Sequence, residues 1–155
     1  MIPNAFLINR GKLNHDGLAE RSLEFKANNI IIVYRRRGGP GKIEFFQRGP
    51  EGLIQIPPIL LIAGVRLQRE FKSRPRPIKS LIISTQPNAS KQIERIANFF
   101  SNFLMTQTTM KTLKNQPALH ISSDTLLLTQ ITFILFPEAE EVGPRITISQ
   151  IVWET

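Results

Sequence analysis

Cysteine is missing from this chain of 155 residues. Its absence excludes a disulfide scaffold, a thiolate zinc site, an iron–sulfur cluster and a cysteine nucleophile. Histidine is scarce as well, since only His15 and His120 are present, and neither belongs to a metal-binding motif such as H-E-x-x-H. We therefore expect no bound metal and no cofactor.

Long apolar segments are also missing. The longest apolar run, residues 56–65, contains Pro57, Pro58 and Gly64. It is far shorter than the roughly 18 apolar residues that a membrane-spanning helix needs. The N-terminus has neither the positive region nor the apolar core of a secretory signal. The sequence therefore predicts an intracellular or virion-associated protein with no secretion signal and no transmembrane segment.

Common enzyme motifs do not occur either. The stretch 38–42 (GGPGK) looks like a phosphate-binding loop, but Arg36 stands where the motif needs its first glycine, and Ile43 where it needs Ser or Thr. No G-x-S-x-G nucleophile motif is present. We therefore predict a non-catalytic protein. One catalytic alternative stays open, a metal-independent ribonuclease that uses His15 and His120 as general base and acid.

Basic charge is what the sequence has in excess. The chain holds 20 Lys and Arg against 12 Asp and Glu, which gives a formal net charge of +8. With 41% hydrophobic residues it can bury a core, so it is not a disordered basic tail. Of the 20 basic residues 12 are Arg, whose planar guanidinium suits phosphate recognition. A partner that carries negative charge follows from this composition.

The basic charge is concentrated in one part of the chain. Residues 1–79 hold 15 basic and 6 acidic residues, whereas residues 80–155 hold 5 basic and 6 acidic ones. Such an asymmetry predicts a surface that faces a polyanion. The alternative explanation is that these cations only keep strand edges soluble.

Two basic clusters and one aromatic side chain carry the predicted site. One cluster surrounds the glycine-rich stretch 38–41, and the other includes the R-P-R-P segment. The predicted polyanion-binding residues are Tyr34, Arg35, Arg36, Arg37, Lys42, Arg66, Arg69, Lys72, Arg74, Arg76 and Lys79. Tyr34 is included because an exposed aromatic ring beside cations can stack on an unpaired base.

Strand patterns dominate the chain. Alternation of apolar and polar residues, or enrichment in β-branched residues, predicts strands over 22–26, 30–37, 42–48, 53–71, 78–84, 119–136 and 145–153. The segment 53–71 is either two strands or one long bent strand. Gly and Pro predict turns at 38–41 and 49–52, and the acidic stretch 138–144 is predicted to be a loop.

One helix is predicted, over about residues 89–113. Asn88 or Ser90 supplies its N-cap, and apolar residues then recur at helical spacing from Ile93 to Leu104. The predicted fold class is α+β, a mostly antiparallel β-meander sheet with this one main amphipathic helix packed on it. We expect a single domain over 1–155, with a basic strand-rich half (1–79) and a half that contains the helix and the C-terminal strands (80–155).

These patterns favour a non-catalytic, basic, nucleic-acid-binding structural protein of a ribonucleoprotein assembly, which contacts phosphates independently of sequence. RNA is the favoured partner, and another polyanion is the other choice. The alternative is a self-assembling viral matrix- or shell-type protein, a homo-oligomer that binds an acidic membrane surface or a nucleocapsid. The His-based ribonuclease is a more distant alternative.

Overall fold

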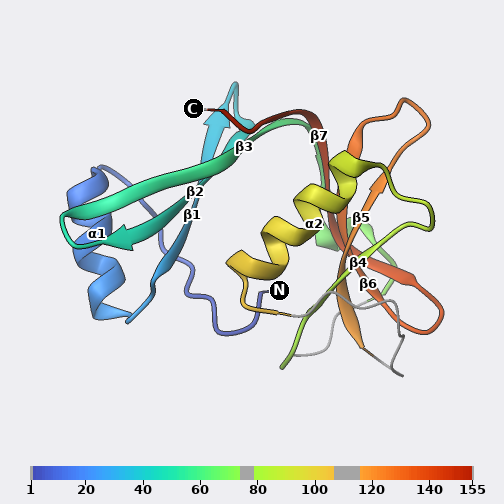
Figure 1. The fold of residues 1–155 in the computed structure, drawn as a ribbon, viewed down its shortest axis with the longest axis horizontal. Coiled ribbons are helices and arrows are strands. Elements are labelled where there is room, and N and C mark those ends of the chain that lie inside the picture. Colours follow the sequence, from blue (N-terminus) through green and yellow to red (C-terminus); the bar gives the residue numbers. More distant parts are fainter. Residues whose placement is uncertain (1, 74–78, 107–115, 155) are drawn as a thin grey trace. The chain divides into compact units, whose positions relative to one another are not determined.

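The computed structural model describes residues 2–73, 79–106 and 116–154. Its elements, in chain order, are α1 (His15–Glu24), β1 (Asn29–Arg36), β2 (Gly39–Gly49), β3 (Gly52–Arg66), a short 3-10 helix η1 (Gln68–Glu70), β4 (Ile82–Thr85), α2 (Lys91–Phe103), β5 (Pro117–Ser123), β6 (Thr129–Leu135) and β7 (Glu140–Val152) (Figure 1). The strands hydrogen-bond in the order β1-β2-β3-β7-β6-β5-β4. β4 and β5 are parallel, whereas β1–β2, β2–β3, β5–β6 and β6–β7 are antiparallel. The predicted α+β class with a mostly antiparallel sheet is confirmed.

The chain forms two compact units. The α1 unit consists of Asn4–Leu61 and Gln150–Thr155, and the α2 unit consists of Met1–Pro3 and Ile62–Ser149. Both β3 and β7 pass from one unit into the other, because the unit boundaries fall inside these strands. That the whole chain folds as one domain stays a prediction.

The α1 unit packs its helix on the β1–β2 hairpin. Leu18 of α1, Ile32 of β1 and Phe46 of β2 are buried together. The helix begins at a side-chain cap, since the Oδ1 atom of Asn14 accepts a hydrogen bond of 2.9 Å from the backbone N–H of Gly17. This cap satisfies one of the free N–H groups at the helix start.

The strand predicted at 22–26 is wrong, because most of this segment belongs to α1. Leu18 and Ser22, one helical turn apart, are buried, whereas Leu23 is exposed. The helical spacing was hidden because one of the two buried residues is a serine. Its hydroxyl donates to the backbone carbonyl of Ala19, so it is buried without an unpaired polar atom. The structure therefore has a second helix that the sequence analysis missed.

The α2 unit is built around its amphipathic helix. α2 buries Ile93, Ile96, Ala97, Phe100 and Phe103 and packs on β4 and β5. Ser90 is the N-cap, as predicted, and its hydroxyl accepts a hydrogen bond from the backbone N–H of Ile93.

The end of α2 differs from the prediction. The helix stops at Phe103, and Met105 has a positive φ of 52°, which a helix does not allow. The hydroxyl of Ser101 then donates to the backbone carbonyl of Thr106, which satisfies a carbonyl just past the helix. The rest of the predicted helix, residues 107–113, lies outside the described residues.

A turn interrupts the long strand predicted over 119–136. The carboxylate of Asp124 accepts hydrogen bonds of 2.9 Å from the backbone N–H groups of Leu126 and Leu128, and Leu127 has a positive φ of 60°. An aspartate that bonds its own following backbone forms such a turn. Leu126 and Leu127 are exposed, so the apolar content of this segment gave a misleading strand signal.

Other boundaries shift less. The predicted strands at 30–37 and 42–48 correspond to β1 and β2. For the segment 53–71, the alternative of one long strand corresponds to β3, which ends at Arg66. β7 begins inside the predicted acidic loop, at Glu140. In the described part of the chain, no helix has the length and apolar character needed to cross a membrane.

Truncation of a core side chain in α2 tests the packing of the α2 unit. Ile96 is fully buried, and its replacement in Ile96→Ala leaves a cavity that costs about 2–5 kcal/mol of unfolding free energy. Leu126→Ala is the control, because Leu126 is 77% exposed and its loss should change stability by no more than about 0.5 kcal/mol. Urea unfolding followed by circular dichroism measures both. Equal effects would contradict the described core.

Candidate functional site

The first predicted basic cluster lies at the tip of the β1–β2 hairpin. Arg35 and Arg36 end β1, and Arg37 lies in the turn with a positive φ of 48°. All three side chains are exposed, and none forms an ion pair with the described residues. The turn is so tight that a Cβ atom on Gly41 would lie only 2.6 Å from the Cβ atom of Arg36. Glycine therefore allows the two strands to close directly beside three cations.

Tyr34 and Lys42 face each other across the same hairpin. They are paired residues of β1 and β2, and the Nζ atom of Lys42 lies 4.4 Å from the centre of the Tyr34 ring. The guanidinium of Arg10 also lies over this ring, at 5.4 Å. Lys42 donates a hydrogen bond of 2.6 Å to the carboxylate of Glu44. Tyr34 is thus a half-buried ring covered by cations, and Arg10 and Glu44 are partners that the sequence analysis missed.

The ionisation of this group follows from its contacts. Burial raises the pKa of the Tyr34 hydroxyl, and its hydrogen bond with Glu44 adds to the rise. Burial also acts to raise the pKa of Glu44, but hydrogen bonds from Lys42 and Tyr34 and the charge of Lys42 together lower it. At neutral pH Tyr34 is neutral and Glu44 is ionised. Lys42 is therefore already paired with a carboxylate, whereas the three arginines are not.

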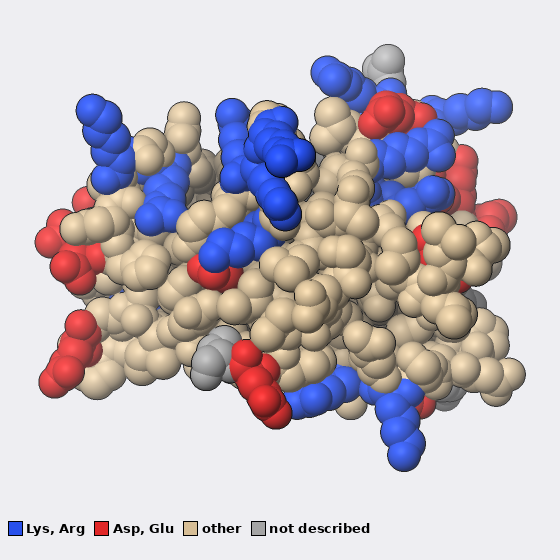
Figure 2. All heavy atoms as spheres, turned by 90° about the horizontal axis from the view of Figure 1, so that it is seen from above, with Lys and Arg blue, Asp and Glu red and all other residues tan. Residues whose placement is uncertain are grey.

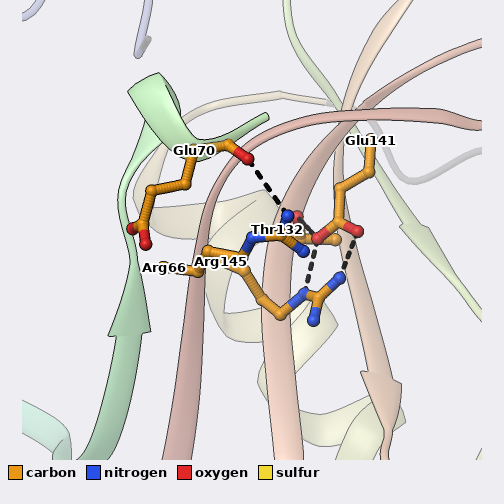
Figure 3. A network of polar contacts seen from close by, with 5 residues as sticks. All are labelled: Arg66, Glu70, Thr132, Glu141 and Arg145. Atoms are coloured by element: carbon orange, nitrogen blue, oxygen red, sulfur yellow. Dashed lines mark hydrogen bonds and ion pairs between the residues drawn. The ribbon is translucent and has the colours of Figure 1, made fainter. Parts of the chain in front are cut away.

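A second cluster, which we name the Phe71 cluster, consists of Arg66, Phe71, Thr132, Glu141 and Arg145 of the α2 unit. The guanidinium of Arg66 lies 4.4 Å from the centre of the Phe71 ring, and that of Arg145 lies 5.8 Å from it. Arg145 binds Glu141 through two nitrogens, and its Nε atom lies 2.6 Å from Oε1 (Figure 3). Thr132 donates a third hydrogen bond, of 2.7 Å, to Oε1 of Glu141.

The carboxylate of Glu141 is held in its ionised form. Hydrogen bonds from Arg145 lower the pKa of Glu141, partial burial opposes them, and the hydroxyl of Thr132 and the charges of Arg145 and Arg66 lower it further. The same hydrogen bond raises the pKa of Arg145. Glu141, Thr132 and Arg145 were not among the predicted site residues. Glu141 and Arg145 lie four residues apart in β7, and the pairing of β6 with β7 brings Thr132 to them.

A glycine fixes the position of the Phe71 ring. Gly143 of β7 has a positive φ of 63°, and a Cβ atom there would lie 2.3 Å from Cε2 of Phe71. The ring therefore rests against the backbone of β7, and no larger residue fits beneath it. This contact places the two guanidinium groups over the ring in a defined geometry, as cation–π contacts require.

The remaining predicted cations are distributed as follows. Arg66, Arg69, Lys72 and Lys79 belong to the α2 unit and are exposed. Arg74 and Arg76 lie outside the described residues. Figure 2 shows Lys and Arg side chains projecting from the viewed surface in groups, with acidic side chains beside some of them.

The two histidines belong to different units. His15 is in the α1 unit, with its ring 5.1 Å from that of Phe46. His120 is in the α2 unit, where its Nδ1 atom lies 2.8 Å from the hydroxyl of Ser84. Neither unit by itself supplies both groups of an acid–base pair. Among the described residues no three His, Asp or Glu side chains are grouped so that they could hold a metal ion.

Comparison with known proteins shows the fold. No protein-family model matches the chain, and no curated protein matches it. Several solved structures are similar in fold, including the following two. A probable ribosomal biogenesis protein from Aeropyrum pernix K1 has 24% sequence identity and a TM-score of 0.74, over 97% of this chain and 85% of that one. Mil, an archaeal Imp4-like protein, has 19% identity and a TM-score of 0.58, over 95% of this chain and 81% of that one.

Replacement of Glu141 by glutamine tests the ion pair in the Phe71 cluster. Because folding lowers the pKa of Glu141, its carboxylate stabilises the fold above the pH at which unfolded glutamate titrates, about 4.3. This stabilisation is lost as the pH falls through the lower, folded pKa. We expect Glu141→Gln to lower the melting temperature at neutral pH and the difference to shrink below about pH 4. Thermal unfolding at several pH values measures it.

Glu138→Gln is the matched control. Glu138 is exposed and forms no ion pair with the described residues. Its replacement should leave the melting temperature nearly unchanged at each pH. If the two variants melt alike at neutral pH, the pair of Glu141 and Arg145 does not stabilise the fold.

Proposed function

We propose that this protein is a non-catalytic RNA-binding component of a ribonucleoprotein assembly, which holds RNA mainly through its phosphates. One observation carries the proposal: Arg35, Arg36 and Arg37 are gathered at a glycine-closed hairpin tip, exposed and without an acidic partner among the described residues. Three adjacent cations with no counter-charge attract a polyanion strongly. The likeness in fold to a probable ribosomal biogenesis protein supports a role in ribonucleoprotein assembly.

The cations of the chain are expected to contribute unequally. Lys42 and Arg145 already bind carboxylates, at Glu44 and Glu141. A phosphate would have to displace these carboxylates, so the two residues gain little from RNA. Exposed cations without such partners release counterions when they meet phosphate, and they supply most of the affinity. Tyr34 is half-buried and lies beneath two cations, so we assign it to holding Lys42 rather than to stacking on a base.

Arg66, Arg69 and Lys72 provide a second set of phosphate contacts, on the α2 unit. Arg66 also donates a hydrogen bond of 3.0 Å to the backbone carbonyl of Glu70 and lies over the Phe71 ring. These contacts restrict its guanidinium, which lowers the entropy that would be lost on binding a phosphate. Neither similar structure is described as a matrix or shell protein, and we do not extend the proposal to membranes or to self-assembly.

Neutralisation of the hairpin arginines tests the proposal. The probe is a fluorescently labelled single-stranded RNA, and its anisotropy gives the affinity between about 50 and 200 mM salt. In the triple variant Arg35→Gln, Arg36→Gln and Arg37→Gln, we expect the slope of log affinity against log salt to decrease by about 2. Each phosphate contact on a single strand contributes about 0.7 to that slope.

A second triple variant controls for net charge. Lys12→Gln, Lys26→Gln and Lys91→Gln remove the same three charges from exposed positions outside both basic clusters. Contact at the hairpin predicts that this variant keeps nearly the full slope and affinity. If both triple variants weaken binding equally, only overall charge matters and the assigned site is wrong. If the unmodified protein binds no RNA at low salt, the proposed function fails.

A further inference from the structure

A pocket of about 590 Å³ lies in the α2 unit, whereas the hairpin arginines belong to the α1 unit. Its walls include Ser84, His120, Gln130 and Thr132, and the ion pair of Arg145 with Glu141 also lines it. Pockets of this size are typical of small-molecule sites. Nothing in the proposed phosphate contacts uses it.

The pairing of the strands builds this pocket. Ser84 of β4 is paired with His120 of β5, His120 with Thr132 of β6, and Thr132 with Arg145 of β7. Residues directly opposite each other in neighbouring strands have side chains on the same face. A row of four polar side chains therefore crosses four strands. The next residue along each strand faces the other way, as the buried side chains of Ile83, Leu119 and Phe133 illustrate.

The helix α2 does not cover this face of the sheet. α2 packs on β4 and β5, and no residue of α2 lines the pocket. Within the α2 unit the apolar face of the strands is thus covered by the helix, and the polar face carries the pocket. Polar side chains on a sheet face that is hollowed rather than packed are available to a ligand.

Ser84 and His120 give the pocket uncharged polar atoms that are held in place. The hydroxyl of Ser84, a residue only 5% exposed, lies 2.8 Å from Nδ1 of His120. Burial lowers the pKa of His120, and the opposing charge of Glu141 does not outweigh it, so the imidazole is neutral at neutral pH. With Nδ1 bound to Ser84, the imidazole of His120 makes no other hydrogen bond with the described residues, and its Nε2 atom is available to a ligand.

Two glutamine amides add further donors and acceptors. The side-chain oxygen of Gln86 accepts a hydrogen bond of 2.8 Å from the backbone N–H of Ser123, which leaves its NH₂ group to donate. Gln130 lines the pocket, and its side-chain amide makes no hydrogen bond with the described residues. Phe136 and Ile134 supply an apolar wall beside these amides. Polar groups that line a pocket and have no protein partner can form hydrogen bonds with a ligand.

These features fit a planar, uncharged ligand with several donors and acceptors along its edge. A phosphate is a poor fit, because the one cation at the pocket, Arg145, is already bound to Glu141, and the carboxylate repels an anion. A nucleobase is a good fit, since it is neutral, flat and rich in hydrogen-bonding atoms, and proteins read unpaired RNA bases by their edges.

We propose that this pocket binds one unpaired nucleobase of an RNA strand, an inference that rests on the proposed RNA-binding function and adds a base-reading site to it. A cation of the protein is available for the RNA backbone next to the bound base. Arg66 lies over the same Phe71 ring as Arg145, and its charge acts on Glu141, which lines the pocket. We assign the adjoining phosphate to Arg66. Binding of a single base is compatible with phosphate contacts that ignore sequence elsewhere.

Two substitutions in the pocket test the inference. Gln130→Leu removes the unused amide at nearly the same volume, and Ser122→Leu places a larger side chain in the pocket from the residue paired with Gln130. Gln92→Leu, on the exposed side of α2, is the matched control. The probes are a short single-stranded RNA and the same ribose-phosphate backbone with every base removed.

The unmodified protein should bind the RNA more tightly than the backbone without bases. Each pocket variant should weaken binding of the RNA by about five- to tenfold, the value of one or two lost hydrogen bonds. Neither should change the affinity for the backbone without bases or the salt slope, and Gln92→Leu should change nothing. The triple arginine variant should give a different pattern. Because it removes phosphate contacts, it should weaken binding of both probes to the same extent.

The outcomes separate the two proposals. If both probes bind equally well and the pocket variants have no effect, the base-binding pocket is wrong while the RNA-binding function stands. If neither probe binds, the function itself fails. If circular dichroism shows that a pocket variant does not fold, the inference is tested on the unmodified protein instead. Its His120 imidazole signals are then followed by nuclear magnetic resonance while each probe is added. They should shift with the RNA and not with the backbone alone, and a shift with neither overturns the inference.

Discussion

Strand alternation on β4 to β7 gives the α2 unit two faces of opposite chemistry, and most of what this unit does depends on that separation. Ile83 and Ile121 are fully buried beneath α2, so the apolar face has its cover and the hydrophobic burial that stabilises the unit. The neighbouring residue in each strand, Ser84 in β4 and His120 in β5, then points to the opposite face, which α2 does not cover. Because Ser84 and His120 bond to each other there, the polar face can be partly buried without a large desolvation penalty.

The desolvation penalty of burying polar groups also explains why the basic residues fall into two groups. Lys42 and Arg145 lie where aromatic rings and neighbouring strands partly bury them, and each has a carboxylate, Glu44 or Glu141, within hydrogen-bonding distance. A partly buried cation without such a partner would cost free energy. The arginines at the hairpin tip are exposed to water and need no such partner. Their charge is therefore not neutralised by a carboxylate of the described residues, and it is available to a polyanion.

The local parts of the fold could be predicted from the sequence, and the reasons are visible in particular residues. β1, β2 and the start of α2 were found because β-branched runs, glycine turns and the Ser90 cap act within a few residues. α1 was missed because one of its buried positions is Ser22, which carries no apolar signal. The turn at Asp124 was missed because exposed leucines follow it.

The sequence by itself determined the excess of positive charge, its concentration before residue 80, the three arginines at a glycine-rich turn and the amphipathic character of α2. Only the tertiary structure decided which cations keep their charge free and which polar side chains meet. Arg66 meets the pair of Glu141 and Arg145, and Ser84 meets His120 and Thr132, through pairing and packing of segments far apart in the chain. Composition and local periodicity contain no information on such register, because the free energy of pairing depends on side chains on both strands.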